Sequence, residues 1–111
     1  MGGIVGSFSR VNAMEKVWIT TAEVKVEPGD MPSGDTLGFM RVTMWAASPE
    51  ELLHRLTKYL AKYRWELLSM EKTEVVDPSV DHGDEINQMI DETLRDQNAV
   101  RLGTFYSYKP N

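Results

Sequence analysis

Two segments in the first half of the chain alternate between apolar and polar positions. They run from residue 15 to 27 and from residue 37 to 47. One side of the first carries Trp18, Thr20, Ala22, Val24 and Val26, and one side of the second carries Met40, Val42, Met44 and Ala46. A period of two residues is typical of β-strands. Prolines and glycines interrupt the pattern at 28–36, since proline fixes φ and glycine opens positive φ. We expect a long antiparallel hairpin with a mobile loop at 28–36.

Residues 48–64 have the pattern of an amphipathic helix. Ser48 can accept a hydrogen bond from the first free backbone amides, Pro49 fits the first helical position, and Glu51 completes a capping box. Apolar residues then recur at steps of three and four, at Leu52, Leu53, Leu56, Tyr59, Leu60 and Tyr63. This spacing places them on one stripe of a helix. The helix is expected to end near Arg64.

The second half of the chain predicts a strand, a helix and a last strand. Residues 65–76 carry apolar side chains at both odd and even positions, which is typical of a strand covered on both faces. Asp77 and Pro78 end it, and residues 81–84 can cap a helix that reaches about Gln97. Its apolar positions are Ile86, Met89, Ile90, Thr93 and Leu94. β-branched and aromatic residues at 100–108 predict the last strand.

The resulting order, β-β-α-β-α-β, predicts an α+β protein with a four-stranded, largely antiparallel sheet. Two amphipathic helices can bury their apolar stripes on one face of such a sheet and leave the other face open. This order resembles the ferredoxin-like two-layer sandwich, or a permuted form of it, and the resemblance implies a fold but no activity. We expect one domain at 14–111. Residues 1–13 show no periodicity and are predicted to be a flexible N-terminal arm.

Charge and composition exclude several classes of function. The 111 residues include 12 basic and 17 acidic side chains, for a formal net charge of -5, and no cysteine. An acidic protein repels phosphate backbones, so nucleic acid is not expected as a partner. Without cysteine there is no disulfide, thiolate nucleophile or iron-sulfur site. No apolar run approaches the ~20 residues of a membrane span, and we expect a cytoplasmic protein of bacterial type.

One acidic segment could be taken for a metal site. It holds Asp77, Asp81, His82, Asp84 and Glu85. As a calcium loop it fails, because the sixth position from Asp77 is a histidine where glycine is needed, and the twelfth is Gln88 where glutamate is needed. We interpret it as a polar turn before a helix whose N-terminus favours acids. No metal, cofactor or catalytic residue is assigned.

The two predicted helices differ in the sign of their charges. Residues 54–64 carry four basic side chains and no acid, whereas residues 77–96 carry seven acids and only Arg95. Such an asymmetry can select a partner. The simpler interpretation is that the helices lie side by side on the sheet and their charges neutralise one another.

The open sheet face is predicted to be too apolar for water. It would carry Val17, Ile19, Phe39, Arg41, Thr43, Trp45, Arg101, Phe105 and Ser107. Soluble monomers seldom expose large apolar patches, so another protein surface or a ligand should cover this face. A one-residue shift in the last strand would instead bring Leu102, Thr104, Tyr106 and Tyr108 to it.

Two functions are consistent with such a face. The first is a noncatalytic interaction or regulatory domain that forms a homodimer through the sheet and presents the 28–36 loop or a helix face to a protein partner. The alternative is a small-molecule binder or cofactor-free enzyme with an aromatic pocket on the sheet. Its candidate ligand-binding residues are Phe39, Arg41, Trp45, Arg101 and Phe105. No titratable base is evident among them, which favours binding over catalysis.

Overall fold

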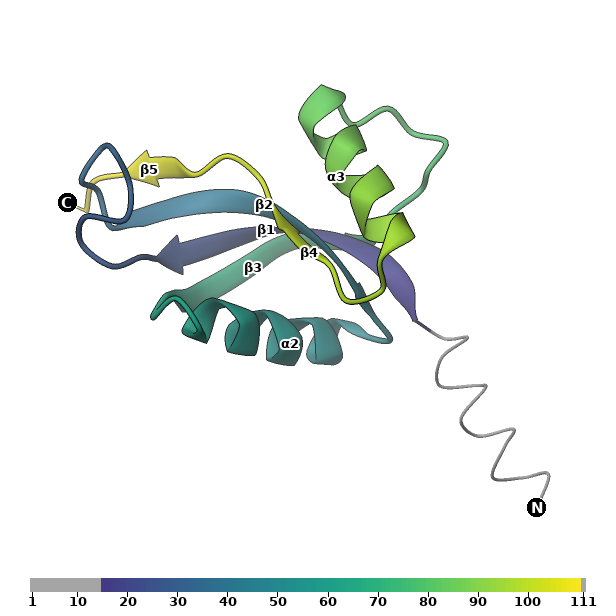
Figure 1. Ribbon diagram of the computed structural model, residues 1–111, viewed down its shortest axis with the longest axis horizontal. Coiled ribbons are helices and arrows are strands. Elements are labelled where there is room, and N and C mark those ends of the chain that lie inside the picture. The colour runs from purple at the N-terminus through teal and green to yellow at the C-terminus, as the bar shows by residue number, and fades with distance from the viewer. Residues whose placement is uncertain (1–14, 111) are drawn as a thin grey trace, which may run out of the picture.

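The computed structural model describes residues 15–110, so the predicted arm at 1–13 lies outside the described residues. The elements are β1 (Lys16–Lys25), β2 (Leu37–Ala46), α2 (Pro49–Ala61), β3 (Glu66–Val75), α3 (Asp84–Arg95), β4 (Val100–Leu102) and β5 (Tyr106–Tyr108) (Figure 1). Every strand pairing is antiparallel, and the order across the sheet is β3-β1-β2-β4, with β5 also paired to β2. The predicted α+β class, with an antiparallel sheet and two helices, is confirmed.

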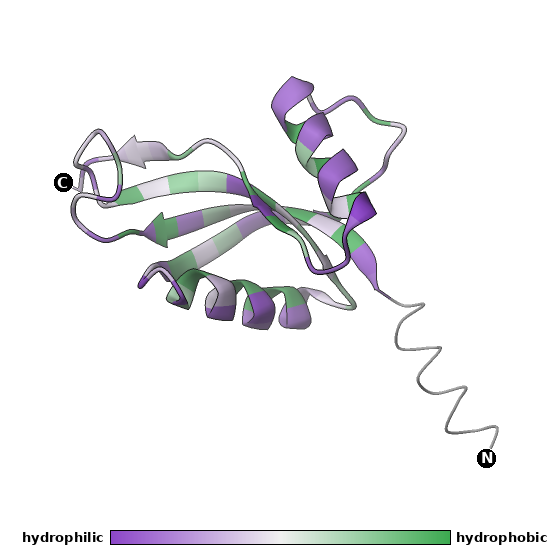
Figure 2. Cartoon of the chain, viewed as in Figure 1, coloured by the Kyte–Doolittle hydropathy of each residue, from purple (hydrophilic) through white to green (hydrophobic). Residues whose placement is uncertain are grey.

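The helix α2 begins where its capping signal predicts. The Ser48 hydroxyl accepts the amide of Glu51 at 3.1 Å, and the Glu51 carboxylate accepts the amide of Ala47 at 2.8 Å. These two bonds satisfy donors at the helix start that have no partner within the helix. The sheet-facing side of α2 is hydrophobic and its outward side is hydrophilic (Figure 2). The cap therefore sets the start of the helix, and its apolar stripe turns toward the sheet.

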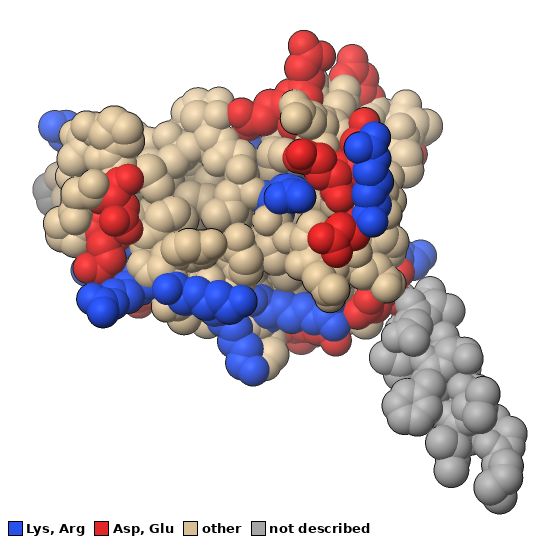
Figure 3. All heavy atoms as spheres, viewed as in Figure 1, with Lys and Arg blue, Asp and Glu red and all other residues tan. Residues whose placement is uncertain are grey.

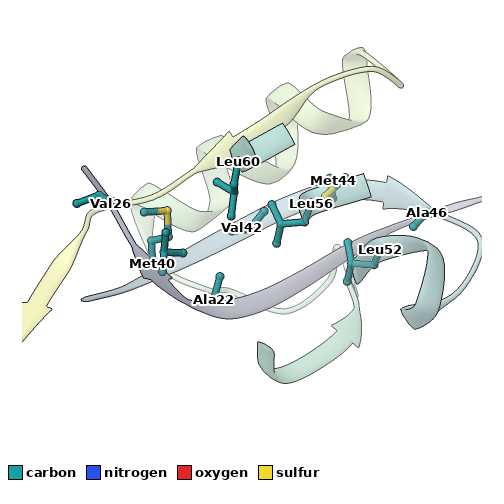
Figure 4. Packing of buried hydrophobic residues seen from close by; sticks show 10 residues of the cluster. Ala22, Val26, Met40, Val42, Met44, Ala46, Leu52, Leu56 and Leu60 are labelled. Carbon is teal, nitrogen blue, oxygen red and sulfur yellow. The ribbon is translucent and has the colours of Figure 1, made fainter. Parts of the chain in front are cut away.

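The sheet face beneath α2, which we call the α2 face, holds the main core. It is formed by Ala22, Val24, Val26, Met40, Val42, Met44 and Ala46 together with Leu52, Leu56 and Leu60 of α2 (Figure 4). The three leucines are fully buried. Burying each such side chain contributes about 1.5–3 kcal/mol, so this face supplies much of the folding free energy.

The helix α3 packs on the opposite face, which we call the α3 face. Ile86, Met89 and Ile90 contact Val17 and Ile19 there, together with Val76 and Trp45. The prediction that both helices share one face is therefore wrong, and α3 forms a partial third layer over one end of the sheet (Figure 1). The reason is that α2 already fills the first face, whereas the apolar end of the second would otherwise lie in water.

The predicted last strand is divided into β4 and β5 by one extra residue. Leu102 pairs with Val42 and Tyr106 pairs with Phe39, so three residues lie opposite two. Because an inserted residue reverses the side-chain alternation, the strand changes phase at this point. Arg101 lies on the α3 face, opposite Thr43, as the first placement of the last strand predicted. Tyr106 lies on that same face, as the alternative placement, shifted by one residue, predicted.

The change of phase sends Phe105 to the α2 face. Its ring packs against the α2-face core. A Cβ atom built at Gly38 would lie 2.5 Å from the tip of this ring, so only glycine leaves room for it. The predicted placement of Phe105 on the open face is therefore wrong. The extra residue between β4 and β5 reverses the alternation of side chains, so Phe105 lies on the α2 face.

The loop at 28–36 is tied to the core. The indole nitrogen of Trp65 donates to the Asp30 carboxylate at 2.7 Å, and Met31 packs against the α2-face core. The amide of Val26 closes the loop by donating to the Thr36 carbonyl at 2.8 Å. A loop lies where proline and glycine predicted one, with both a polar and an apolar anchor.

Candidate functional site

The part of the α3 face that α3 leaves open ends in a cleft of about 370 Å3, which we call the α3 cleft. Thr21 of β1 and Phe39 and Arg41 of β2 line it from the sheet, and His82 and Asp84 line it from the start of α3. Tyr106 of β5 completes the lining. Segments that are far apart in the sequence meet here because α3 crosses the sheet over only one end.

Two cationic or proton-carrying side chains in this cleft have unsatisfied nitrogen atoms. The Nε atom of Arg41 and the Nε2 atom of His82 are buried, and neither has a hydrogen-bond partner within residues 15–110. Buried polar atoms nearly always have a partner, because leaving one unpaired costs about 1–3 kcal/mol. Both residues line the same cleft.

Two carboxylates near the start of α3, those of Asp81 and Glu85, are engaged by other groups. The Glu85 carboxylate accepts the Thr104 hydroxyl at 2.6 Å and the Thr104 amide at 3.2 Å, and these bonds lower the pKa of Glu85. Asp81 accepts the amide of Gly83 and the side-chain amide of Asn87, both at 2.9 Å, and these bonds lower its pKa. Both acids therefore stay charged but are held outside ion-pair distance of Arg41.

The open sheet beside the cleft carries aromatic side chains and one half-buried acidic side chain, Glu23. The rings of Phe39 and Tyr108 lie 5.3 Å apart. The Glu23 carboxylate accepts the Tyr108 hydroxyl and, at 3.1 Å, the Ser69 hydroxyl. The hydrogen bond to Glu23, together with burial, raises the pKa of Tyr108. This network holds Glu23 against the sheet and leaves the Phe39 ring as the apolar floor next to Arg41.

The five residues proposed from the sequence are brought together only in part. Phe39 and Arg41 share the α3 cleft. Trp45 lies under α3, where its indole nitrogen donates to the Thr93 carbonyl at 2.6 Å. Arg101 is at the sheet edge, 3.7 Å from Glu92, and Phe105 is on the opposite face. A single pocket containing all five does not form.

Sequence reasoning missed the contribution of His82 to this site. Its only local signal was its position directly before Gly83 and the acidic helix start. Gly83 is the N-cap of α3 at φ 91°, a value that favours glycine, and the amide of His82 donates to Asn87 at 3.0 Å. This turn places His82 in the lining of the α3 cleft, which the linear pattern could not predict.

The acidic segment does not gather into a metal site within the part of the chain that the structure describes. Asp77 instead accepts the hydroxyl and the amide of Ser79, at 2.7 and 3.0 Å, and these bonds lower its pKa. Together with the bonds of Asp81, they make the segment a series of short polar turns before α3.

The α3 cleft places hydrogen-bond donors next to an apolar surface. A guanidinium offers up to five donors in a plane, and His82 Nε2 donates when it carries a proton. The Phe39 and Tyr106 rings provide apolar surface nearby, and 64% of the Tyr106 residue is exposed.

None of the described helices is long and apolar enough to cross a bilayer. Comparison with family models, with curated proteins and with solved structures finds no match to this chain.

Proposed function

We propose that this protein binds a small organic carboxylate that carries an apolar ring, and that it does so in the α3 cleft. The observation that carries the proposal is the pair of buried, unpaired nitrogens of Arg41 and His82. A carboxylate matches the planar donors of arginine and can accept two bonds at once. The volume of the α3 cleft, about 370 Å3, falls within the roughly 300–1,000 Å3 of small-molecule pockets.

The apolar part of the ligand is inferred from the walls of the cleft. Phe39 and Tyr106 belong to paired strands and lie directly opposite each other in the register. A ring placed beside them would be removed from water on one side while its carboxylate contacts Arg41. The floor and the cation are thus adjacent on β2, two residues apart on the same face.

Binding is proposed in preference to catalysis. Glu85, which lines the cleft, accepts two hydrogen bonds from Thr104, and its lowered pKa makes it a weaker base. Homodimerisation through the sheet remains a prediction. Its argument is weaker than expected, because α3 buries Val17, Ile19 and Thr43, which are at most 5% exposed.

The test uses benzoate and its neutral isostere benzamide as probes. Binding is measured by the changes in the chemical shifts of the backbone amides. We expect benzoate, and not benzamide, to shift the amides of β2 and of residues 82–86. Arg41→Gln should weaken benzoate binding by about tenfold or more, as expected for loss of a charge-assisted hydrogen bond. Native mass spectrometry of gently purified protein would reveal a retained ligand together with the number of subunits.

Arg101→Gln is the matched control, because it makes the same change in charge on the same face but outside the cleft. It should leave benzoate binding unchanged. Equal binding of benzoate and benzamide, or equal effects of the two substitutions, would contradict the proposal.

A further inference from the structure

A row of basic side chains lies along α2, on the opposite side of the sheet from the acidic helix α3. Because α2 and α3 pack on opposite faces, the predicted neutralisation of one helix by the other is wrong. Basic side chains follow α2 along the lower edge of the molecule, and acidic ones gather over α3 (Figure 3). A protein with a net charge of -5 therefore keeps one concentrated basic strip on residues 54–64.

Three of the four cations of this strip, Lys58, Lys62 and Arg64, form no ion pair with an acidic side chain of residues 15–110. Arg55 is 2.8 Å from Glu15 and 3.3 Å from Glu51. Lys58 and Lys62 are four residues apart on one side of α2. Like charges at this spacing weaken a helix by a few tenths of a kcal/mol, and an acidic group bound between them would relieve the repulsion.

These lysines form one wall of a groove of about 330 Å3 that lies apart from the α3 cleft. The other wall includes Asn98, Ala99 and Val100, where the chain enters β4. β4 is the last strand in the order β3-β1-β2-β4, so its outer edge pairs with no strand of residues 15–110. A free strand edge offers backbone donors and acceptors to an extended peptide.

The groove thus combines a basic wall with an unpaired strand edge. We propose that it binds an extended acidic segment of a partner protein, which adds to the sheet beside β4 and places its carboxylates against Lys58 and Lys62. Residues 55 to 62 span only about 10 Å along the helix axis, enough for a few extended residues. A nucleic acid would need many more phosphate contacts, and the acidic remainder of the surface would repel it.

The opposite edge of the sheet is unsuited to this role. β3 carries two register irregularities against β1, and Lys72 within it has a positive φ of 53°. Such bulges and charged side chains are devices that keep an edge from pairing with another strand. Strand addition is therefore favoured at β4, where the charge also matches.

The probe is a fluorescein-labelled peptide in which Glu alternates with Val and Thr. Its binding to the full chain is measured by fluorescence anisotropy. Binding should weaken at high salt, and Lys58→Glu with Lys62→Glu should reduce affinity by about tenfold or more at low salt. The matched control is Lys16→Glu with Lys25→Glu, at exposed positions of β1 outside the groove. It makes the same change in net charge and should alter affinity far less.

Peptide variants separate strand addition from charge attraction alone. The same peptide with alternate backbone nitrogens methylated should bind at least about tenfold more weakly, because it cannot pair with a strand edge. Equal affinity of the methylated peptide or of the lysine double variant would overturn the proposal. So would tighter binding of a single-stranded oligonucleotide, or self-association that the lysine variant abolishes.

Discussion

On the α2 face, three fully buried leucines from one helix cover a continuous layer of aliphatic side chains. On the α3 face, the helix covers only one end of the sheet, and threonine and tryptophan take part in the contact. The Thr43 and Thr93 hydroxyls lie 2.8 Å apart, and both residues are fully buried. Where α3 begins, the buried contact gives way to the cleft that holds Arg41 and His82.

The difference indicates that the two faces serve different purposes. Aliphatic contacts are non-directional and supply free energy in proportion to buried area. Hydrogen bonds such as that from Trp45 to Thr93 are directional, so they fix where α3 lies on the sheet. The position of α3 in turn determines the shape of the cleft. We expect the α2 face to dominate stability and the α3 face to dominate ligand recognition.

The largest expected effect comes from breaking the α2 face. Leu56→Ala should lower the free energy of unfolding by about 2–5 kcal/mol, because it leaves a cavity in a fully buried position. Urea denaturation measures this change. Leu53→Ala is the control on the same helix, where the side chain is 48% exposed and the loss should be much smaller. Similar losses for both would contradict the assignment of the core.

A smaller effect is expected from the polar contact beneath α3. Thr93→Val removes a hydroxyl that donates to the Met89 carbonyl at 2.8 Å and also contacts Thr43. We expect a loss of about 1–2 kcal/mol, since the Thr43 hydroxyl is left buried with a weaker partner. A double-mutant cycle with Thr43→Val should reveal coupling between the two positions. Strictly additive losses would show that the hydroxyls act independently.

The cleft should respond in the opposite direction. Arg41→Met keeps an apolar stem but removes a buried nitrogen that has no partner in residues 15–110. We expect the ligand-free protein to gain about 1 kcal/mol of stability, measured by thermal or urea unfolding. Arg101→Met, at an exposed edge position, should change stability by no more than about 0.5 kcal/mol. A clear loss of stability in Arg41→Met would mean that the arginine has a structural role.

The smallest effect concerns Glu85 at the cleft. Hydrogen bonds from Thr104 lower the Glu85 pKa in the folded protein, so their stabilising contribution is present above the pKa of the unfolded chain and is lost as pH falls. Thr104→Ala should raise the Glu85 pKa toward its ordinary value. The chemical shift of the Glu85 carboxyl carbon, recorded during a pH titration, measures this change. Asp81, which Gly83 and Asn87 hold, should titrate as before. No change at Glu85 would contradict the assigned contact.

Local signals were sufficient to predict most elements. The capping residues at 48–51, the alternation in β1 and β2, and the proline and glycine at 28–36 all act through neighbours in the chain. They therefore predicted the hairpin, the start of α2 and the adjacency of Phe39 and Arg41 on one sheet face. The division of the last strand was less accessible, because the bulge depends on the space that Gly38 leaves for Phe105 across the sheet.

The sequence by itself determined the α+β class, the antiparallel sheet and the presence of an arginine beside an aromatic ring on one face. Only the tertiary structure decided that α3 crosses to the face opposite α2, that Phe105 leaves the site, and that His82 enters it. The physical reason is that an amphipathic stripe specifies which side of a helix is buried, but not against which surface. That choice depends on the apolar area still uncovered after α2 has packed, a property of the assembled sheet rather than of any one segment.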